Sequence, residues 1–143
     1  MLALLVGAGL SASGCAFQSL FSNPLATPDT LGVASGASFG AVLGLLIGLN
    51  LIGVQMLALV FGIAAVLLTW LSGSGKGMNT IILAGIMIGA LFTALVSLVK
   101  YTADVESQLP AITYWLMGSL NNANFNSLML GSPLIIIGIF VLF

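Results

Sequence analysis

The stretch FSNPLATPDTLGVASGASFGAVLGLLIG, residues 21–48, holds two prolines four positions apart. The residue before a proline disfavours helical backbone angles, so a helix arriving from the N-terminal side should end just before Pro24. Thr27 is then placed as the N-cap of a second helix, with Pro28 at its first position and the Asp29 carboxylate near the positive end of the helix dipole. The proline pair therefore predicts a tight connection between two helices.

The same stretch carries a glycine at every fourth position, at Gly32, Gly36, Gly40, Gly44 and Gly48. Residues four apart share one face of a helix, so this face predicts a groove along which another helix approaches backbone to backbone. Milder faces of small residues are formed by Gly7, Ser11, Cys15 and Ser19, and by Gly85, Gly89, Thr93 and Ser97. A tightly packed helix bundle explains these faces more simply than a glycine-lined channel.

Composition places these helices in a membrane. Of the 143 residues, 60% are hydrophobic and 3% are charged, and the mean hydropathy is +1.28, more than a soluble core of this size needs. Between Asp29 and Lys76 lie 46 uncharged residues, which as one helix would reach about 69 Å, over twice a hydrocarbon core of about 30 Å. The segment must therefore fold back once, and the glycines and asparagine of residues 48–55 mark the turn.

Extending this argument along the chain predicts an all-α polytopic bundle of about five membrane spans, because a helix in lipid satisfies its own backbone hydrogen bonds. The expected spans are residues 1–20, 31–49, 56–71, 81–99 and 128–143. Both ends lie inside apolar runs, so we expect a piece of a longer protein.

The beginning of the chain has a second interpretation. LSASGC, residues 10–15, is similar to the lipid-attachment site of a signal peptide. A charged leader is missing and the sequence stays apolar long after Cys15, so a membrane span is favoured. Cys15 is the single cysteine and is interpreted as a small packing residue.

Few residues carry chemistry. The chain has no histidine, and its three carboxylates and one thiol lack metal-ligand spacing, so we expect no metal, no cofactor and no catalytic residue. SGSGKG, residues 72–77, is similar to a phosphate-binding loop, but Trp70 stands where the first glycine is needed and Gly77 where Ser or Thr is needed. A net charge of −1 offers no basic stripe for nucleic acid. If ATP drives this protein, another chain must bind it.

Three stretches together carry a resemblance to a known family. GAGLSASGCAFQSLFSNPLATPDTLGVASGASFGA, residues 7–41, resembles the signature of the FecCD family of bacterial permeases, the membrane subunits of ABC importers for iron-siderophores, haem and cobalamin. IILAGIMIGALFTALVSL, residues 81–98, is similar to that family's fifth span, and ITYWLMGSLNNANFNSL, residues 112–128, to its short outer helix and the entry to its sixth span. The resemblance covers essentially the whole chain.

The resemblance implies a topology. Family members have ten spans, so residues 1–143 would form a single partial permease domain holding about spans two to six, multi-pass in the bacterial cytoplasmic membrane. The proline connection and the loop at residues 72–79 would then face the cytoplasm. A short helix at residues 110–119 would lie outside, with Tyr114 and Trp115 at the outer face. An aromatic pair suits a helix at the membrane interface, and contact with a binding protein or with cargo is an equal alternative.

The resemblance also implies a cytoplasmic gate. In family members that import cobalamin, an asparagine and a leucine of the matching turn close the path, and these positions are Asn23 and Leu25 here. The loop before the fifth span supplies a second constriction, which corresponds to Met78 and Asn79, although these side chains differ from the relative's. The alternative is that Asn23 only caps the first helix while Leu25 packs.

By the same resemblance, the chain belongs to a non-enzymatic permease subunit that moves its cargo by alternating access. Its partners would be a second permease copy or paralogue, ATP-binding subunits that hydrolyse ATP, a periplasmic binding protein and the lipid membrane. An aquaporin-like passive channel and a purely structural membrane subunit are the alternatives. The sequence departs from the family in having no arginine to receive a binding protein, and the loop that ATPase subunits grip is expected beyond Phe143.

Overall fold

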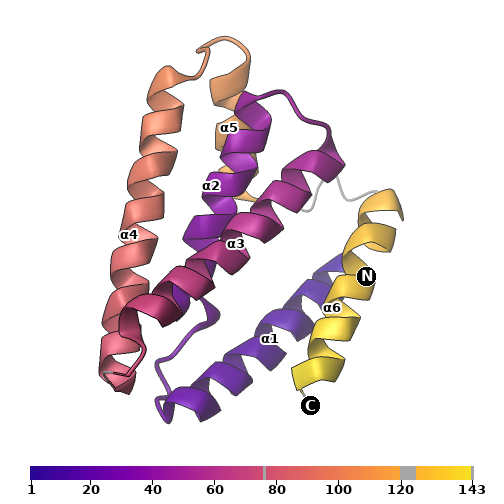
Figure 1. Cartoon of the computed structure of the whole chain (residues 1–143). Helices are drawn as coiled ribbons and strands as arrows, with labels where there is room; N and C mark the ends of the chain where they lie inside the picture. Colours follow the sequence, from indigo (N-terminus) through magenta and orange to yellow (C-terminus); the bar gives the residue numbers. More distant parts are fainter. Residues whose placement is uncertain (76, 120–124, 143) are drawn as a thin grey trace. The chain divides into compact units, whose positions relative to one another are not determined.

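The computed structural model describes residues 1–75, 77–119 and 125–142. These residues form α-helices, one short 3-10 helix and connecting turns, and no strand lies among them, so the expected all-α class is confirmed (Figure 1). In chain order the helices are α1 Leu2–Phe21, the 3-10 helix η1 Pro28–Leu31, α2 Val33–Leu46, α3 Leu51–Gly73, α4 Met78–Thr102, α5 Gln108–Met117 and α6 Phe125–Leu142.

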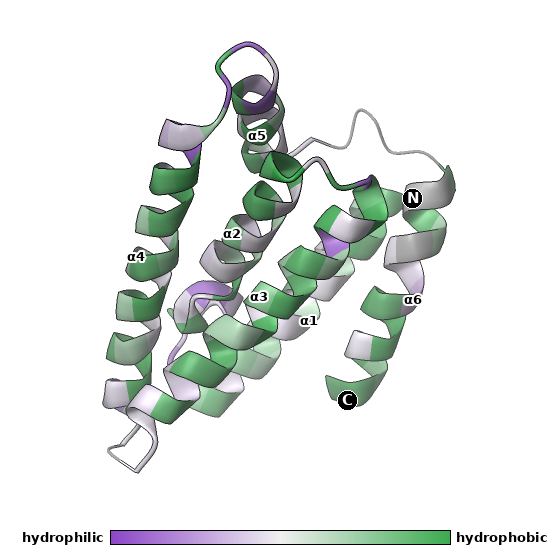
Figure 2. Cartoon of the chain, turned by 45° about the horizontal axis from the view of Figure 1, so that its top comes forward, coloured by the Kyte–Doolittle hydropathy of each residue, from purple (hydrophilic) through white to green (hydrophobic). Residues whose placement is uncertain are grey.

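The helices follow the expected order of spans, but they differ in length. Among the described residues α1, α3 and α4 are long and apolar enough to cross a membrane, whereas α2 and the Gly131–Leu142 part of α6 are shorter apolar helices. Figure 2 shows hydrophobic residues along these helices and hydrophilic residues gathered at the turn between α4 and α5. The span expected at residues 31–49 is thus a helix of 14 residues, because the chain leaves α geometry at both of its ends.

The entry to α2 differs from the sequence prediction. Pro28 opens the 3-10 helix η1, and Gly32, at a φ of 74°, separates η1 from α2. Gly32 is therefore the N-cap residue of α2, whereas Pro28, directly after Thr27, is the first residue of the separate helix η1. Asp29 still serves the helix start, since its Oδ1 accepts a hydrogen bond from the backbone N–H of Ala34 at 3.2 Å.

The turn between α2 and α3 lies inside the expected residues 48–55. Gly48 takes a φ of 76°, and Asn50 is the N-cap of α3. The Asn50 Oδ1 accepts a hydrogen bond from the N–H of Gly53 at 2.9 Å. Because Asn50 caps the helix, α3 begins at Leu51, earlier than the expected start at residue 56.

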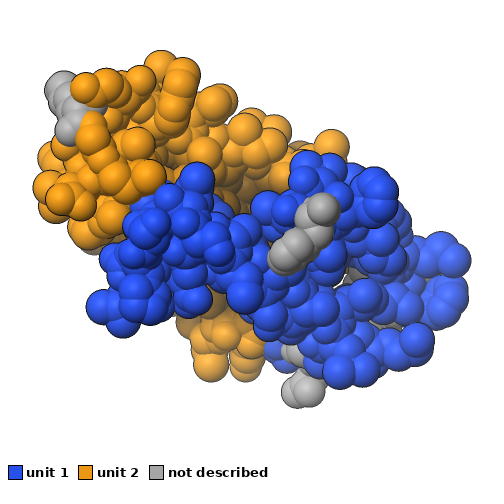
Figure 3. Space-filling view, turned by 90° about the horizontal axis from the view of Figure 1, so that it is seen from below, with its two compact units in different colours: residues 1–28, 119–143 blue, residues 29–118 orange. Residues whose placement is uncertain are grey.

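The chain divides into two compact units (Figure 3). One comprises Met1–Pro28 and Ser119–Phe143, and the other comprises Asp29–Gly118. In the first, α1 lies beside α6, and α6 continues through Pro133. In the second, α2, α3 and α4 pack on one another and α5 packs on α2. The core of this second unit is formed by Val42, Val96, Val99, Ala103 and Ile112.

Candidate functional site

Helices α2 and α3 meet along a seam where α2 carries glycines, which have no side chains. Three α2 glycines are buried where α3 passes, and a Cβ on each would meet α3 within 3.1 Å: Gly36 at the Phe61 carbonyl oxygen, Gly40 at the Leu57 carbonyl oxygen, and Gly44 at the Val54 Cα. Distances this short leave no room for any side chain, so the two backbones are in direct contact.

The two outer glycines of the series do not join this seam. A Cβ on Gly32 would lie 3.0 Å from the backbone nitrogen of Gly89, which is on α4 and not on α3. A Cβ on Gly48 would meet nothing within 4 Å, and this residue serves the turn after α2 through its positive φ. The expected continuous groove of five glycines is therefore shorter, because α2 begins after Gly32 and ends before Gly48.

The α4 glycines enclose the entry to α2. A Cβ on Gly85 would overlap the carbonyl oxygen of Thr30, and a Cβ on Gly89 would lie 3.6 Å from the Cα of Gly32. From the side of α3, the fully buried Thr69 donates a hydrogen bond from its Oγ1 to the carbonyl oxygen of Leu31 at 3.0 Å. Residues 30–32 are thus held between two helices.

The sequence reasoning missed the face of α3 that makes these contacts. Its members are small or polar, are buried in the structure and recur every three or four residues: Gly62, Ala65, Thr69 and Gly73. This spacing is the helical signal that would have found them. A threonine inside a mostly apolar helix is itself a sign of an interhelical hydrogen bond.

Three phenylalanines, one from each helix, complete the packing of α2, α3 and α4. The ring centroids of Phe39 and Phe61 lie 5.0 Å apart at an interplanar angle of 87°. Phe92 lies 5.7 Å from Phe39 and 6.4 Å from Phe61. These edge-on and tilted geometries are the favoured ones for aromatic rings, so the cluster adds to the cohesion of the three helices.

The expected gate turn after α1 has a well-defined geometry. Ser22 takes a left-handed φ of 48° and ends α1. The Oδ1 of Asn23 accepts a hydrogen bond from the N–H of Leu25 at 2.9 Å, and its carbonyl oxygen accepts one from the N–H of Ala26 at 3.1 Å. Within residues 1–143 the Leu25 side chain is 85% exposed. A gate role for this turn stays a prediction.

The second expected gate segment lies in the other unit. Met78 and Asn79 form the first turn of α4 after Gly77, whose φ is 94°, and both side chains are exposed. Each pair of gate residues is therefore ordered within its own unit. Lys76, which precedes this turn, lies outside the described residues.

Helix α5 is buried on one side. Ile112 is fully buried, whereas Tyr114 is 76% exposed and Trp115 36% exposed. Gln108 joins α5 to two other segments, because its Nε2 donates to the carbonyl oxygen of Leu46 at 3.0 Å and its Oε1 accepts from the N–H of Asp104 at 3.1 Å. Asn121, Asn122 and Asn124, which follow α5, are outside the described residues.

The turn between α4 and α5 carries a carboxylate with a shifted pKa. The Asp104 Oδ2 accepts hydrogen bonds from the Ser107 hydroxyl at 2.5 Å and from the Ser107 N–H at 3.0 Å. These bonds stabilise the charged form and hold the pKa of Asp104 below its usual value.

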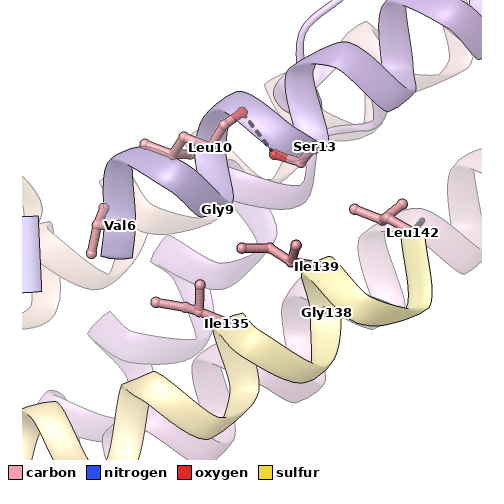
Figure 4. Close-up of a pocket in the computed structure, with 8 residues that line it drawn as sticks. All are labelled: Val6, Gly9, Leu10, Ser13, Ile135, Gly138, Ile139 and Leu142. Carbon is pink, nitrogen blue, oxygen red and sulfur yellow. Dashed lines mark hydrogen bonds between the residues drawn. The ribbon is translucent and has the colours of Figure 1, made fainter. Parts of the chain in front are cut away.

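A groove of about 330 Å³ lies between α1 and α6 (Figure 4). Its lining is almost entirely apolar and comprises Val6, Gly9, Leu10, Ser13, Ile135, Gly138, Ile139 and Leu142. The hydroxyl of Ser13 donates to the carbonyl oxygen of Leu10 at 3.0 Å, so it is satisfied within its own helix. Among the described residues no cluster of three His, Cys, Asp or Glu side chains is found.

Long apolar helices, joined backbone to backbone through glycines, define a multi-pass helical membrane protein. The chain belongs to the FecCD transport family, which it matches over residues 1–143. The resemblance drawn from residues 7–41, 81–98 and 112–128 is thereby confirmed.

Several relatives are permease proteins. The chain is 40% identical over 130 residues to the molybdate import system permease protein of Haemophilus influenzae, covering 89% of this chain and 39% of that one. It is 36% identical over 140 residues to the ferric enterobactin transport system permease protein of Escherichia coli, covering 96% and 42%. For the hemin transport system permease protein of Yersinia pestis the identity is 37% over 147 residues, covering 95% and 43%.

A solved structure is similar in fold as well as in sequence. It is an inward-facing conformation of a metal-chelate type ABC transporter, 40% identical to this chain with a TM-score of 0.89. The match covers 94% of this chain and 44% of the solved one. The chain spans about two fifths of the length of the three permease relatives named above.

Proposed function

We propose that this chain is part of the membrane permease subunit of an ATP-driven ABC importer in the bacterial cytoplasmic membrane. One observation carries the proposal: 94% of the chain superposes on a metal-chelate type ABC transporter with a TM-score of 0.89 at 40% identity. The subunit forms a gated path and catalyses no reaction, and ATP is hydrolysed by a separate ATP-binding chain.

The cargo we propose is an iron-siderophore, haem or cobalamin-type metal chelate. The relatives' names state ferric enterobactin, hemin and vitamin B12, which are chelates, and molybdate, which is an oxyanion. All four compounds contain a transition metal, which is the chemical feature that the cargoes of these relatives share.

The mechanism we propose is alternating access with a gate at the turn after α1. The Asn23 side chain fixes the backbone of Leu25 while the Leu25 side chain remains 85% exposed. An apolar side chain held out from a rigid turn suits a constriction that excludes water, as hydrophobic gates do. Met78 and Asn79 at the start of α4 would supply the second part of this gate.

The partners follow from the same class. We propose a second permease copy or paralogue, ATP-binding subunits and a periplasmic substrate-binding protein, with lipid around the assembly. An aquaporin-like channel and a purely structural subunit are not favoured, because the named relatives are import permeases.

ATP-dependent uptake tests the proposal. The complete permease that contains residues 1–143 is reconstituted in liposomes with its ATP-binding subunits and its binding protein. Ferric siderophores, hemin, cobalamin and molybdate are offered as cargo. We expect uptake of one cargo class that stops when the ATP-binding subunits are made unable to hydrolyse ATP. Uptake that ignores ATP would indicate a channel, and no uptake of any cargo would indicate a structural subunit.

A further inference from the structure

The first turn of α5 is organised by Asp104. The backbone N–H of Ser107 donates to the Asp104 Oδ2 at 3.0 Å, and the N–H groups of Gln108 and Leu109 donate to the Asp104 carbonyl oxygen at 3.1 and 2.9 Å. The next residue, Pro110, has no N–H. The backbone donors that begin α5 are therefore satisfied without the Gln108 side chain.

The Gln108 side chain meets two backbone groups that fix its orientation. The Asp104 N–H can only donate, and it donates to Oε1 at 3.1 Å. The Leu46 carbonyl can only accept, and it accepts from Nε2 at 3.0 Å. Exchanging the oxygen and nitrogen of the amide would break both bonds, so one orientation is selected. The first bond stays within the turn before α5, whereas the second reaches another helix.

That second bond ends on the last residue of α2. A carbonyl at this position of a helix has no partner within the helix. The N–H groups of Gly48 and Leu49, which follow Leu46, bond to earlier carbonyls of α2. The carbonyl end of a helix also carries a partial negative charge, which attracts a donor and repels a carboxylate. The amide of Gln108 thus matches what the end of α2 requires.

Apolar contacts hold the next turn of α5. Ile112 lies four residues beyond Gln108 on the same side of the helix, and it is fully buried in the core that includes Val42 of α2 and Val96 of α4. Burial of apolar surface is non-directional, so by itself it selects the orientation of α5 weakly. A hydrogen bond weakens steeply away from its preferred geometry. The bond between Gln108 and Leu46 is therefore what defines where α5 begins against α2.

We propose that Gln108 is a positioning residue, whose amide donor fixes the start of α5 to the end of α2 through the Leu46 carbonyl. In the proposed permease α5 is the outer helix, so the same bond sets the outer end of the cargo path. This last part rests on the proposed function. Gln108 acts through the placement of α5 and needs no contact with cargo.

Charged substitutions separate this role from a purely local one. The start of a helix favours an anion and the end of a helix favours a cation. If Gln108 served only the start of α5, Gln108→Glu would be harmless and Gln108→Lys harmful. If its donor ties α5 to α2, the order reverses, because lysine retains a donor and ionised glutamate offers only acceptors to the Leu46 carbonyl.

Hydrogen exchange of the complete permease in lipid nanodiscs measures this order without using transport. Mass spectrometry follows the amides of residues 46–49 in the parent and in Gln108→Glu, Gln108→Lys and Gln108→Met. Methionine keeps the approximate shape and removes both hydrogen bonds, which covers the case in which a charged variant fails to assemble. Ala111→Glu and Ala111→Lys are matched controls, because they place the same charges near the start of α5 at an exposed residue.

We expect exchange at residues 46–49 to be roughly three- to ten-fold faster in Gln108→Glu and Gln108→Met than in the parent, because the end of α2 loses one hydrogen bond. Gln108→Lys should stay close to the parent, and the Ala111 pair should leave this segment unchanged. Exchange in Gln108→Met that matches the parent, or faster exchange in Gln108→Lys than in Gln108→Glu, would overturn the proposal.

Uptake assays address the part that rests on the proposed function. Per folded permease, the maximal rate of ATP-dependent uptake should be several-fold lower in Gln108→Glu than in Gln108→Lys. Equal rates in the two variants would remove the role of Gln108 in the cargo path. If the parent imports no cargo, the proposed function fails, while the exchange order still decides whether Gln108 ties α5 to α2.

Discussion

The hydroxyl of Thr69 on α3 donates a hydrogen bond to the carbonyl oxygen of Leu31, across an Oγ1-to-O distance of 3.0 Å. Leu31 is the last residue of η1, and its carbonyl lies just before the left-handed Gly32 that starts α2. A carbonyl at such a break is not part of a regular helix, so a side chain from another helix satisfies it. Thr69 thereby ties the beginning of α2 to the end of α3.

Thr69→Val tests this tie, because valine keeps the shape and removes the hydroxyl. We expect a loss of about 1 to 3 kcal/mol in the free energy of unfolding, since the partly buried Leu31 carbonyl loses its hydrogen-bond partner. Thr69→Ser, which retains the hydroxyl, should lose less than Thr69→Val. Denaturation of the purified permease in detergent measures both, and equal stability of Thr69→Val and the parent would contradict the tie.

Gly40→Leu tests the backbone contact between α2 and α3. Even the first added carbon would overlap the Leu57 carbonyl oxygen, so we expect destabilisation of about 1 to 3 kcal/mol or more. Gly138→Ala in α6 is the matched control, because a Cβ there meets nothing within 4 Å. The control should be neutral or stabilising by about 0.5 to 1 kcal/mol, as alanine favours helix. Thermal unfolding measures both variants, and a Gly40→Leu protein as stable as the parent would show that the seam can open.

Leu25→Ala tests the gate. We expect several-fold faster cargo leakage without ATP in liposomes carrying the complete permease, because the closed mouth becomes wider. The unfolding midpoint should hardly change, since the Leu25 side chain is 85% exposed and fills no core. Leu20→Ala, which truncates an exposed α1 residue outside the turn, is the control and should not leak. A stable Leu25→Ala variant without leakage would leave the turn a purely structural role.

Ser107→Ala tests the origin of the lowered Asp104 pKa. Removing the hydroxyl removes the largest contribution, so the pKa of Asp104 should rise toward its ordinary value of 3.8. Because the folded-state pKa lies below the unfolded one, the carboxylate's contribution to stability is present above the ordinary value and is lost as the pH falls through the lowered pKa. A carboxyl NMR titration follows Asp104, with Ser97→Ala on α4 as the control. An unchanged pKa in Ser107→Ala would assign the shift to the backbone N–H donors instead.

The ends and packing faces of the helices could be predicted where they depend only on residues close in the sequence. Pro24 marks the end of α1, Pro28 marks the start of η1, and glycine spacing identifies the α2 face that meets α3, because these effects act within a few residues. The family was recognisable for the same reason, since residues 7–41 combine these local signals.

Features that depend on a distant neighbour could not be predicted. Gly32 was expected to extend the helix face, but its left-handed backbone places it against Gly89, far along the chain. The helical spacing of Thr69 could have placed it on a buried face of α3, but its partner could not be identified, because a backbone carbonyl 38 residues away leaves no pattern in the side chains. The exposure of Leu25 likewise follows from the geometry of the Asn23 turn and not from the hydrophobicity of leucine.

Hydrogen bonds pin α2 at both ends. Thr69 holds the Leu31 carbonyl just before its start, and Gln108 holds the Leu46 carbonyl at its last residue while also holding the turn at Asp104. At about 1.5 Å per residue, the helix between these two hydrogen-bonded ends is roughly 21 Å long. We therefore expect a displacement of the turn between α4 and α5 to move α2 with it, because Gln108 is hydrogen-bonded to both.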